Sequence, residues 1–288
     1  MDHRARPYRS VLYIPGSKPR ALEKARELPV DAIIFDLEDA VSVEEKPAAR
    51  TLLAETLAGG GYGPRAQIVR INGFETAWGA DDLDAIAAAQ PQAILLPKVN
   101  GPADIAALAD RLDARPETSD TAIWAMMETP VGVLNAQAIA AAPRMAGFVM
   151  GTNDLAKELG SRTRAAMTTA LQHCLLAARA HGLVCVDGVY NAFRDEDGLR
   201  AECAEGRDFG FDGKTLIHPA QVAVANAAFA PSPDEIDLAR RQIAAYEDAV
   251  REGQGVAVVD GRIVENLHVD TARATLARAE AIAALEAA

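Results

Sequence analysis

Short apolar runs alternate with amphipathic stretches along most of the chain. Eight apolar runs stand at residues 10–16, 32–39, 67–73, 93–99, 122–129, 147–154, 183–189 and 214–219. Continuous apolar runs of this length are typical of parallel strands that are buried on both faces. Helical patterns separate them, for example at 42–58, 102–114, 130–142, 165–181 and 195–208. Eight strands alternating with helices predict an α/β fold, the (β/α)8 TIM barrel.

The chain continues beyond the eighth apolar run. A helix is predicted from about residue 233 to 251, with Ser232 or Asp234 as its cap, and a glycine-punctuated segment follows at 253–268. The last helix has one apolar face. We therefore predict a barrel catalytic domain at 1–230 and C-terminal helices with a lid segment at 231–288. The C-terminal part is expected to pack on the barrel or on a neighbouring subunit.

Composition narrows the class of protein. A length of 288 residues fits one barrel, which needs about 250. No apolar run approaches the ~20 residues of a membrane helix, so we expect no membrane contact. The basic start has no apolar stretch behind it, and the three cysteines form no CxxC pair, which favours a reduced protein in the cytoplasm.

The charge is unevenly distributed. A net charge of −12 argues against nucleic acid as a partner, since nucleic acid requires a basic surface. Seven cations nevertheless stand within the first 26 residues: Arg4, Arg6, Arg9, Lys18, Arg20, Lys24 and Arg26. They form either a solvated, salt-bridged face or a basic rim for a phosphorylated ligand.

Polar residues gather where the predicted strands end, which in a barrel is the mouth that holds the active site. Glu128 and Asp154 end consecutive strands, so their carboxylates are expected to be neighbours. Two such carboxylates share a proton, pair with a cation or bind a hard metal such as Mg²⁺. The alternative is that Asp154 caps a helix while Glu128 pairs with a lysine. The five histidines lack ligand spacing, which argues against zinc.

Several ordered motifs resemble those of the citrate lyase β-subunit/malyl-CoA lyase family, of the HpcH/HpaI aldolase type. They are RSVLYIPGSKPR (9–20), DAIIFDLEDAV (31–41), IVRING (68–73), LLPKV (95–99), METPVGVLNA (127–136), MGTNDLAKELG (150–160), VDGVY (186–190) and GFDGKTLIHPAQ (210–221). The resemblance extends from about residue 9 to 280. Segments 150–162, 186–203 and 258–268 most resemble the branch of the family that hydrolyses (3S)-malyl-CoA.

The resemblance implies a role for each matching residue. Glu128 and Asp154 would hold Mg²⁺, for which Mn²⁺ would substitute, and Arg70 would bind a substrate carboxylate or the thioester oxygen. Glu38 and Asp39 would stand near metal-bound water as further catalytic residues. The expected substrate-binding residues are Arg70, Arg9, Lys18, Arg20, Gly151, Thr152 and Asn153. The basic ones would meet the phosphates of CoA, which belongs to the substrate and is not a prosthetic group.

One departure from the lyase pattern concerns the C-terminal segment. The lyases carry an aspartate in a pattern like GKMVD-x-P that reaches a neighbouring subunit's active site, whereas this chain has Glu265 followed by Asn266. The carboxylate therefore stands about 1.5 Å further out. A reacting group displaced by roughly 1 Å can cost about a hundredfold in rate. Glu265 is thus expected to be a catalytic residue that favours hydrolysis, or else a surface charge of the lid.

The function expected from these residues is net hydrolysis of (3S)-malyl-CoA to malate and CoA. The alternative is carbon–carbon cleavage of malyl-CoA, methylmalyl-CoA, or citramalyl- or citryl-CoA to an acyl-CoA and a 2-oxo acid. Two further alternatives are a metal-dependent aldolase acting on a free keto-acid and a subunit of a citrate lyase-like complex. The resemblance also implies a homotrimer or a dimer of trimers.

Overall fold

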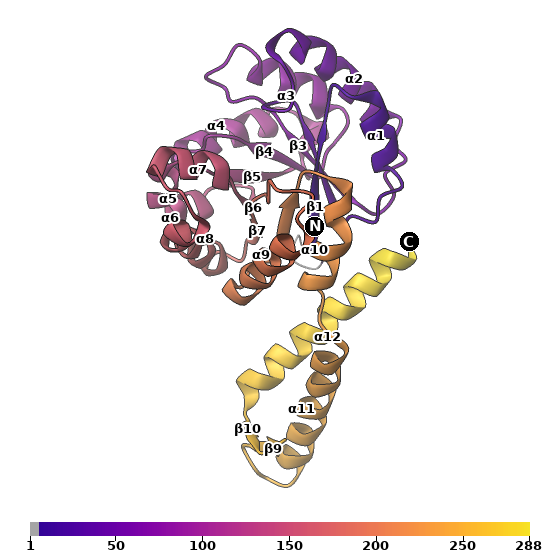
Figure 1. Cartoon of the computed structure of the whole chain (residues 1–288), viewed down its shortest axis with the longest axis vertical. Coiled ribbons are helices and arrows are strands. Elements are labelled where there is room, and N and C mark those ends of the chain that lie inside the picture. Colours follow the sequence, from indigo (N-terminus) through magenta and orange to yellow (C-terminus); the bar gives the residue numbers. More distant parts are fainter. Residues whose placement is uncertain (1–5) are drawn as a thin grey trace. The chain divides into compact units, whose positions relative to one another are not determined.

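Eight parallel strands close into a barrel (Figure 1). The computed structural model describes residues 6–288, so Arg4 of the basic segment lies outside the described residues. The strands are β1 (Ser10–Pro15), β2 (Ala32–Asp36), β3 (Ala66–Arg70), β4 (Ala93–Leu96), β5 (Ala122–Met127), β6 (Met145–Met150), β7 (Val184–Asp187) and β8 (Gly213–Leu216). The predicted (β/α)8 barrel is confirmed.

The register brings the carboxyl ends of the strands to one mouth. Every neighbouring pair is parallel, and β1 closes the barrel by pairing with β8, Leu12 opposite Leu216. Most of the predicted apolar runs extend past the observed strands by several residues. Those extra residues, Glu38 and Glu128 among them, begin the loops at the mouth, where a barrel carries its chemistry.

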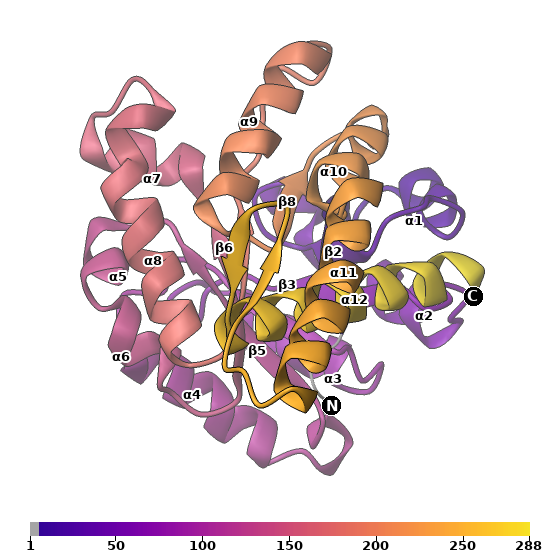
Figure 2. The same ribbon diagram turned by 90° about the horizontal axis from the view of Figure 1, so that it is seen from below.

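Helices surround the strands (Figures 1 and 2). The α-helices of this layer are α1 (Pro19–Ala25), α2 (Lys46–Ala58), α3 (Gly79–Ala87), α4 (Pro102–Asp113), α5 (Pro130–Leu134), α6 (Ala136–Ala140), α7 (Thr152–Leu159), α8 (Thr168–Ala180), α9 (Glu196–Phe209) and α10 (Val222–Phe229). Short 3₁₀ turns stand at η2 (Val43–Glu45), η3 (Pro116–Thr118), η4 (Arg164–Met167) and η5 (Pro219–Gln221). None of the helices within residues 6–288 combines the length and apolar character that a membrane crossing requires.

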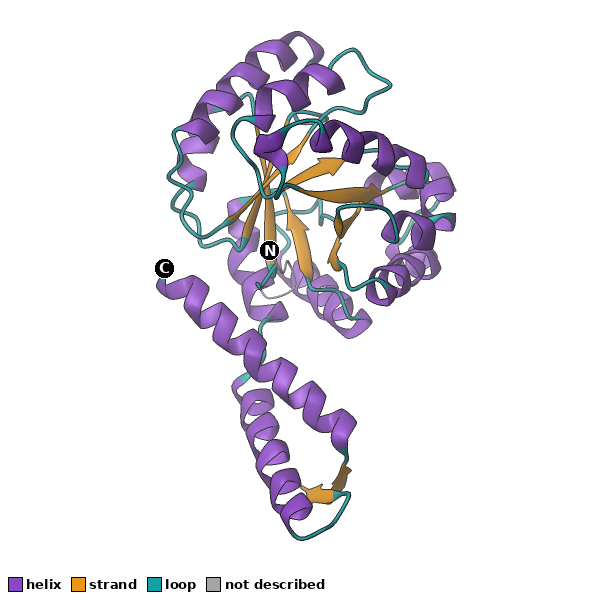
Figure 3. Cartoon of the chain, turned by 180° about the vertical axis from the view of Figure 1, so that it is seen from behind, coloured by secondary structure: helices purple, strands orange, loops and turns teal. Residues whose placement is uncertain are grey.

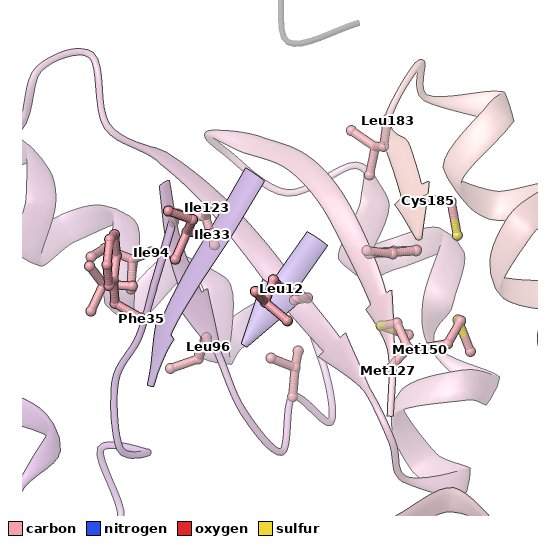
Figure 4. Close-up of a cluster of buried hydrophobic side chains, with 14 of the residues drawn as sticks. Leu12, Ile33, Phe35, Ile94, Leu96, Ile123, Met127, Met150, Leu183 and Cys185 are labelled. Atoms are coloured by element: carbon pink, nitrogen blue, oxygen red, sulfur yellow. The ribbon is translucent and has the colours of Figure 1, made fainter. Parts of the chain in front are cut away.

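Alternate residues of each strand supply two separate apolar layers. One set fills the barrel interior, where Tyr8 packs on Trp124 with ring centroids 5.1 Å apart. Gly147 makes room for Trp124, because a Cβ there would lie 2.5 Å from its indole ring. The other set, including Leu12, Ile33 and Phe35, lies between strands and helices (Figure 4). These layers hold the strands rigidly, so side chains at the strand ends have fixed positions.

Residues 230–288 form a second compact unit. It contains α11 (Pro233–Arg251), the antiparallel hairpin of β9 (Ala257–Val259) and β10 (Arg262–Val264), and α12 (Asn266–Ala287), as Figure 3 shows. The two long helices pack on each other, and Val264 and Val269 belong to a small apolar core of this unit. Ser232 caps α11 by accepting a 3.2 Å hydrogen bond from the N–H of Glu235.

Candidate active site at the barrel mouth

A cavity of about 300 Å³ opens at the carboxyl ends of the strands. Its lining combines charged and polar side chains with apolar ones: Tyr13, Asp36, Asp39, Ala40, Arg70, Met126, Glu128, Met150, Gly151, Thr152, Asn153, Asp154, Val189, Thr215 and Ile217. Of the expected site residues, Arg70, Asp39, Glu128, Gly151, Thr152, Asn153 and Asp154 line this one cavity. A concave, partly apolar site with a few converging charged groups is typical of a small-molecule site.

Arg70 is held by a carboxylate on the neighbouring strand. Its Nε and Nη2 each donate a 2.7 Å hydrogen bond to Asp36, one to each carboxylate oxygen. The guanidinium lies 5.0 Å from the ring centroid of Tyr13, a cation–π distance. Burial alone would lower the pKa of Arg70, but the charge and hydrogen bonds of Asp36 together with Tyr13 and Glu38 outweigh it and raise that pKa. Arg70 is therefore a fixed cation facing the cavity.

Glu38 stands beside this cation and is largely buried. Nη1 of Arg70 lies 2.7 Å from Oε2 of Glu38 and 3.5 Å from Oδ2 of Asp39. Burial raises the pKa of Glu38 to about 7, against the lowering effect of Arg70, and the charges of Asp39 and Asp36 add to the rise. A carboxyl group that titrates near neutral pH can both take and give a proton.

Buried polar contacts fix the loop that carries Glu38. The ammonium group of Lys46 donates to the carbonyl oxygens of Leu37 (3.1 Å) and Glu38 (2.8 Å) and to Oδ1 of Asn72 (2.8 Å). Asn72 in turn donates a 2.9 Å hydrogen bond to the carbonyl of Leu37. These bonds join the ends of β2 and β3, which keeps Glu38 and Arg70 together.

Glu128 and Asp154 are brought together as expected from their place at the ends of β5 and β6. The ammonium group of Lys98 lies between them, in a short contact with Oδ2 of Asp154 and 3.5 Å from Oε1 of Glu128. The N–H of Lys98 also donates a 2.7 Å hydrogen bond to Glu128. The φ of Lys98, +52°, lies in the left-handed region, a strained backbone conformation that often marks functional sites.

This pair of carboxylates fits a magnesium ion. Within residues 6–288 no group of three or more histidine, cysteine, aspartate and glutamate side chains is arranged to bind a metal. Mg²⁺ needs only one or two carboxylates when waters and substrate oxygens complete its shell. Both groups offer hard oxygen donors, and a cationic group already stands between them. Burial raises the pKa of Glu128, and a nearby cation counteracts that rise.

The segment Gly151–Asn153 begins α7 beside these carboxylates. Gly151 is required by close approach, because a Cβ there would lie 2.4 Å from Cβ and 2.7 Å from Oε2 of Glu128. Thr152 is buried, whereas Asn153 is exposed and exchanges hydrogen bonds with Asn191. The three residues thus form the wall of the cavity next to Asp154.

The basic N-terminal residues separate into two groups. Lys18 and Arg20 are exposed and follow β1 on the mouth side, where Lys18 lies 3.4 Å from Glu45. Arg9 was expected at the substrate, and this expectation is wrong. It precedes β1 at the opposite end of the barrel and is buried, its Nε and Nη2 donating to both oxygens of Asp31 at 3.0 and 2.9 Å. A guanidinium committed to that buried pair does not reach the mouth.

Asp187 also ends a strand but does not face the cavity. It is fully buried on the helix side of β7, where Lys214 lies 3.0 Å from Oδ2 and Arg164 lies 2.9 Å from Oδ1. Lys214 also contacts Glu202 of α9 at 2.6 Å. The cluster joins β7 and β8 to the helix layer, so its charge is structural.

Sequence reasoning missed Tyr13 and Asp36 and gave Lys98 no role. All three have charged partners at the mouth. The missed signal was the two-residue alternation within the strands, which puts Tyr13 on the same face as Val11, and Asp36 on the same face as Ile34.

Glu265 belongs to the second compact unit. It is exposed and immediately precedes α12, and its N–H donates a 3.0 Å hydrogen bond to Nδ1 of His268. Glu265 directly follows β10, the second strand of the hairpin.

Comparisons with known proteins identify relatives in sequence and in fold. The profile of the HpcH/HpaI aldolase/citrate lyase family matches residues 9–219. A (3S)-malyl-CoA thioesterase of Cereibacter sphaeroides is 66% identical over the whole of both chains. Citrate lyase subunit beta of Escherichia coli is 34% identical over 97% of this chain and 95% of its own. The crystal structure of CitE from Mycobacterium tuberculosis, in complex with magnesium, acetoacetate and coenzyme A, superposes with a TM-score of 0.78 at 31% identity, covering 96% of this chain and 99% of that one.

Proposed function

The chain belongs to the HpcH/HpaI aldolase/citrate lyase family, and we propose that it is a Mg²⁺-dependent enzyme that hydrolyses (3S)-malyl-CoA to malate and CoA. The observation that carries this proposal is the full-length, 66% identity to a (3S)-malyl-CoA thioesterase. The mouth cavity supports it, because it combines two carboxylates for a hard metal with one fixed guanidinium.

The metal would be held by Glu128 and Asp154. Bound there, Mg²⁺ supplies Lewis-acid polarisation of the substrate oxygens it contacts. Mn²⁺, which also prefers oxygen ligands, is proposed as a substitute. Lys98 contacts the same two carboxylates and would compete with a divalent cation for them.

Arg70 orients and stabilises the substrate. Nε and Nη2 of Arg70 each donate one hydrogen to Asp36, and Nη1 contacts Glu38 and Asp39. One hydrogen of Nη2 is left for the substrate, which would compete with Glu38 and Asp39 for those of Nη1. A guanidinium fork recognises a carboxylate or a developing oxyanion in two places at once. In hydrolysis this group stabilises the negative charge that forms on the thioester oxygen when water attacks.

Two carboxyl groups are proposed to handle protons. Glu38 titrates near neutral pH and stands 2.7 Å from Arg70, so it accepts a proton from the attacking water or returns one to the leaving thiol. Asp39, which lines the cavity, is proposed to position that water. Glu265 is proposed as the second base, contributed by the C-terminal lid.

The substrate's CoA moiety is proposed to meet Lys18 and Arg20. Both are exposed and follow β1 on the mouth side of the barrel, where an anionic group approaching the cavity would pass. Arg9 is not part of this proposal, because it is buried against Asp31.

A second candidate function is carbon–carbon cleavage of the same substrate. The 34% identity to citrate lyase subunit beta favours it. In that reaction loss of the hydroxyl proton of malyl-CoA releases glyoxylate, and Arg70 stabilises the thioester enolate that remains. Both reactions would use the same cavity, so they are distinguished by the products that form.

The test is incubation of the purified chain with (3S)-malyl-CoA and Mg²⁺, with free thiol and glyoxylate measured separately. Free thiol without glyoxylate supports hydrolysis. Glyoxylate together with acetyl-CoA would contradict hydrolysis and support carbon–carbon cleavage. An Asp154→Asn variant serves as the control for contaminating thioesterases, because it alters one proposed metal ligand. Absence of both products would contradict the proposed substrate.

The chain is proposed to act in the cytoplasm as a homo-oligomer, a trimer or a dimer of trimers. Its three cysteines, Cys174, Cys185 and Cys203, are unpaired and buried, which suits a reducing compartment. The exposed Val256, Val258, Ile263 and Leu267 of the C-terminal unit provide apolar surface for contact with another subunit.

A further inference from the structure

The hydroxyl group of Tyr13 donates to a weak acceptor at the mouth of the barrel. Tyr13, on β1, lines the cavity together with Arg70 and Glu128. Its Oη donates a 3.4 Å hydrogen bond to Sδ of Met126. A thioether sulfur accepts only weakly, so an oxygen acceptor that enters the cavity can take over this hydrogen. The hydroxyl group is therefore available as a donor to a bound ligand.

The carboxylates around Tyr13 have other partners. Both oxygens of Asp36 accept hydrogen bonds from Arg70, and Oε2 of Glu38 lies 2.7 Å from Nη1 of Arg70. Glu128 accepts a 2.7 Å hydrogen bond from a backbone N–H. Burial raises the pKa of Tyr13 against the lowering effect of Arg70, and the charges of the three carboxylates add to the rise. The phenol therefore keeps its hydrogen and serves as a donor, not as an acid.

Arg70 leaves little donor capacity for a substrate oxygen. Its Nε and one hydrogen of Nη2 bind Asp36, and its Nη1 contacts Glu38, so one hydrogen of Nη2 is left. An oxygen that becomes negatively charged is stabilised by each donor aimed at it, so a neighbouring neutral donor adds to what the guanidinium provides. Tyr13 is such a neighbour, because the guanidinium carbon lies 5.0 Å from the centroid of its ring.

Strand alternation directs these two side chains to the same place. Tyr13 stands two residues after Val11, and Arg70 stands two residues after Ile68, and both of these apolar residues belong to the layer inside the barrel. Tyr13 itself packs against that layer. The phenol and the guanidinium therefore project from β1 and β3 to the inner end of the cavity.

The oxygens of the proposed substrate differ in what they suit. The carboxylate and the adjacent hydroxyl group of a malyl thioester suit the proposed metal pair, Glu128 and Asp154, because hard oxygen donors complete a Mg²⁺ shell. The thioester oxygen remains for the Arg70 side of the cavity. We propose that the hydroxyl group of Tyr13 donates to this thioester oxygen beside Nη2 of Arg70, an inference that rests on the proposed function.

Negative charge forms on the thioester oxygen in either candidate reaction. In hydrolysis the water oxygen bonds to the thioester carbon, the π electrons move to the carbonyl oxygen, and Glu38 takes the water proton. The carbonyl then reforms as the carbon–sulfur bond breaks, the electron pair of that bond leaves with sulfur, and the thiolate receives the proton. In carbon–carbon cleavage the same oxygen carries the charge of the enolate. Tyr13 stabilises this charge and transfers no proton.

The experiment compares Tyr13→Phe and Tyr13→Leu with the parent on (3S)-malyl-CoA at saturating Mg²⁺. Tyr13→Phe keeps the ring beside Arg70 and removes the hydroxyl group alone. We expect its kcat and kcat/KM to fall together, on the order of a hundredfold, as for the loss of one oxyanion donor. Tyr13→Leu, which lacks the ring as well, is expected to lose at least as much. Parent-like kcat in Tyr13→Phe, with a loss confined to Tyr13→Leu, would overturn the proposal, because only the ring would then matter.

Tyr62→Phe is the matched control, since it makes the same change at a buried tyrosine between the strands and the helices. Oη of Tyr62 donates a 3.1 Å hydrogen bond to the carbonyl of Leu22, and its ring lies edge-on to Phe35 with centroids 4.9 Å apart. We expect the kcat of the folded Tyr62→Phe protein to equal that of the parent. An equal loss of kcat in Tyr13→Phe and Tyr62→Phe would attribute the effect to a loosened barrel and would refute the role of Tyr13.

Infrared difference spectroscopy of bound acetyl-CoA, isotope-labelled at the thioester carbonyl, separates this inference from the proposed function. Acetyl-CoA keeps the thioester but lacks the malyl hydroxyl and carboxylate, so the measurement does not depend on malyl-CoA turnover. The parent is expected to lower the carbonyl stretching frequency relative to free acetyl-CoA, and Tyr13→Phe is expected to lower it less. This result supports the Tyr13 donor even if malyl-CoA is not hydrolysed. Equal frequencies in parent and variant, or an unshifted frequency in the parent, contradict it even if malyl-CoA is hydrolysed.

Discussion

Asp36 and Arg70 are register partners on adjacent strands, and both oxygens of the aspartate accept 2.7 Å hydrogen bonds from the guanidinium. Because both side chains are buried, the pair is rigid, and it fixes which edge of the guanidinium faces the cavity. Asp36 therefore holds the guanidinium of Arg70 in one orientation toward the cavity.

Arg70→Lys is expected to be nearly as damaging as Arg70→Ala. An ammonium group cannot span both oxygens of Asp36 and still present two donors to a substrate. We expect kcat/KM for malyl-CoA to fall by about a hundredfold or more in both variants, a loss similar to that of an oxyanion donor. If Arg70→Lys keeps most of the parent kcat/KM while remaining folded, Arg70 is a structural partner of Asp36 only.

Asp154→Asn is expected to abolish activity without unfolding the protein. The Asp154 side chain is 33% exposed, so removal of its charge costs little stability, whereas a two-carboxylate metal site loses half of its charge. Calorimetric titration should show Mn²⁺ or Mg²⁺ affinity reduced by on the order of a hundredfold. Excess chelator should likewise stop the parent enzyme, and added Mg²⁺ should restore it. Full activity of the parent in chelator would exclude the metal site.

The raised pKa of Glu38 predicts a stability change with pH. Burial raises this pKa from 4.5 to about 7 in the folded protein, so the protonated carboxyl favours folding. That stabilisation is complete below pH 4.5 and is lost as the pH rises through about 7. With chelator present, the stability of the parent relative to Glu38→Gln should fall across this window and level off above it. Urea unfolding of both proteins below, within and above the window measures this, and a constant difference would show that the pKa of Glu38 is not raised.

The sequence was sufficient to predict the barrel, because strands that are buried on both faces appear in the sequence as continuous apolar runs. The eight apolar runs identify the eight strands, and the helical periodicity of the segments between the runs identifies the helices. The strand ends were overestimated, since residues such as Leu37 remain buried after the strand has ended.

The direction of the side chains at the strand ends was harder to predict from the sequence than the strands themselves. Glu128 and Asp154 meet as expected because they follow consecutive strands. Asp187 is the last residue of its strand, yet it faces the helices, because one residue of shift along a strand reverses the side. Arg9 stands before its strand, so proximity in sequence to Lys18 did not place it at the mouth. Pairing partners such as Asp36 depend on the register between strands, which no single run of residues displays.

Removal of residues 253–288 is expected to weaken subunit assembly and to lower activity. Apart from its packing on α11, helix α12 leaves Leu267 60% exposed, and the hairpin leaves Val258 and Ile263 exposed, all of which suit a contact with another subunit. Light scattering of the parent should give a trimer or a multiple of it. A parent that is fully active as a monomer would contradict this prediction.

The identity of the side chain at position 265 is expected to influence the balance of products. Glu265 is exposed and immediately precedes α12, and we propose that its carboxylate acts on the substrate. Glu265→Ala should lower turnover while leaving calorimetric Mg²⁺ affinity unchanged, which separates a role toward substrate from a role toward metal. Glu265→Asp shortens the side chain by about 1.5 Å and approaches the lyase pattern. It should reduce hydrolysis and raise the proportion of cleavage.

That shift should be partial, because Asn266 and Leu267 still begin α12 in place of the residues that follow the aspartate in the lyases. The measurement is the ratio of free CoA to glyoxylate formed from (3S)-malyl-CoA by the parent and by each variant. Asp270→Asn, which changes a carboxylate one turn further along α12, is the control, and it should leave the ratio unchanged. An aspartate variant with the parent's ratio and nearly the parent's rate would mean that Glu265 takes no part in the reaction. The preference for hydrolysis would then have to arise at the barrel mouth, where Glu38 contacts Arg70 and burial raises the pKa of Glu38 to about 7.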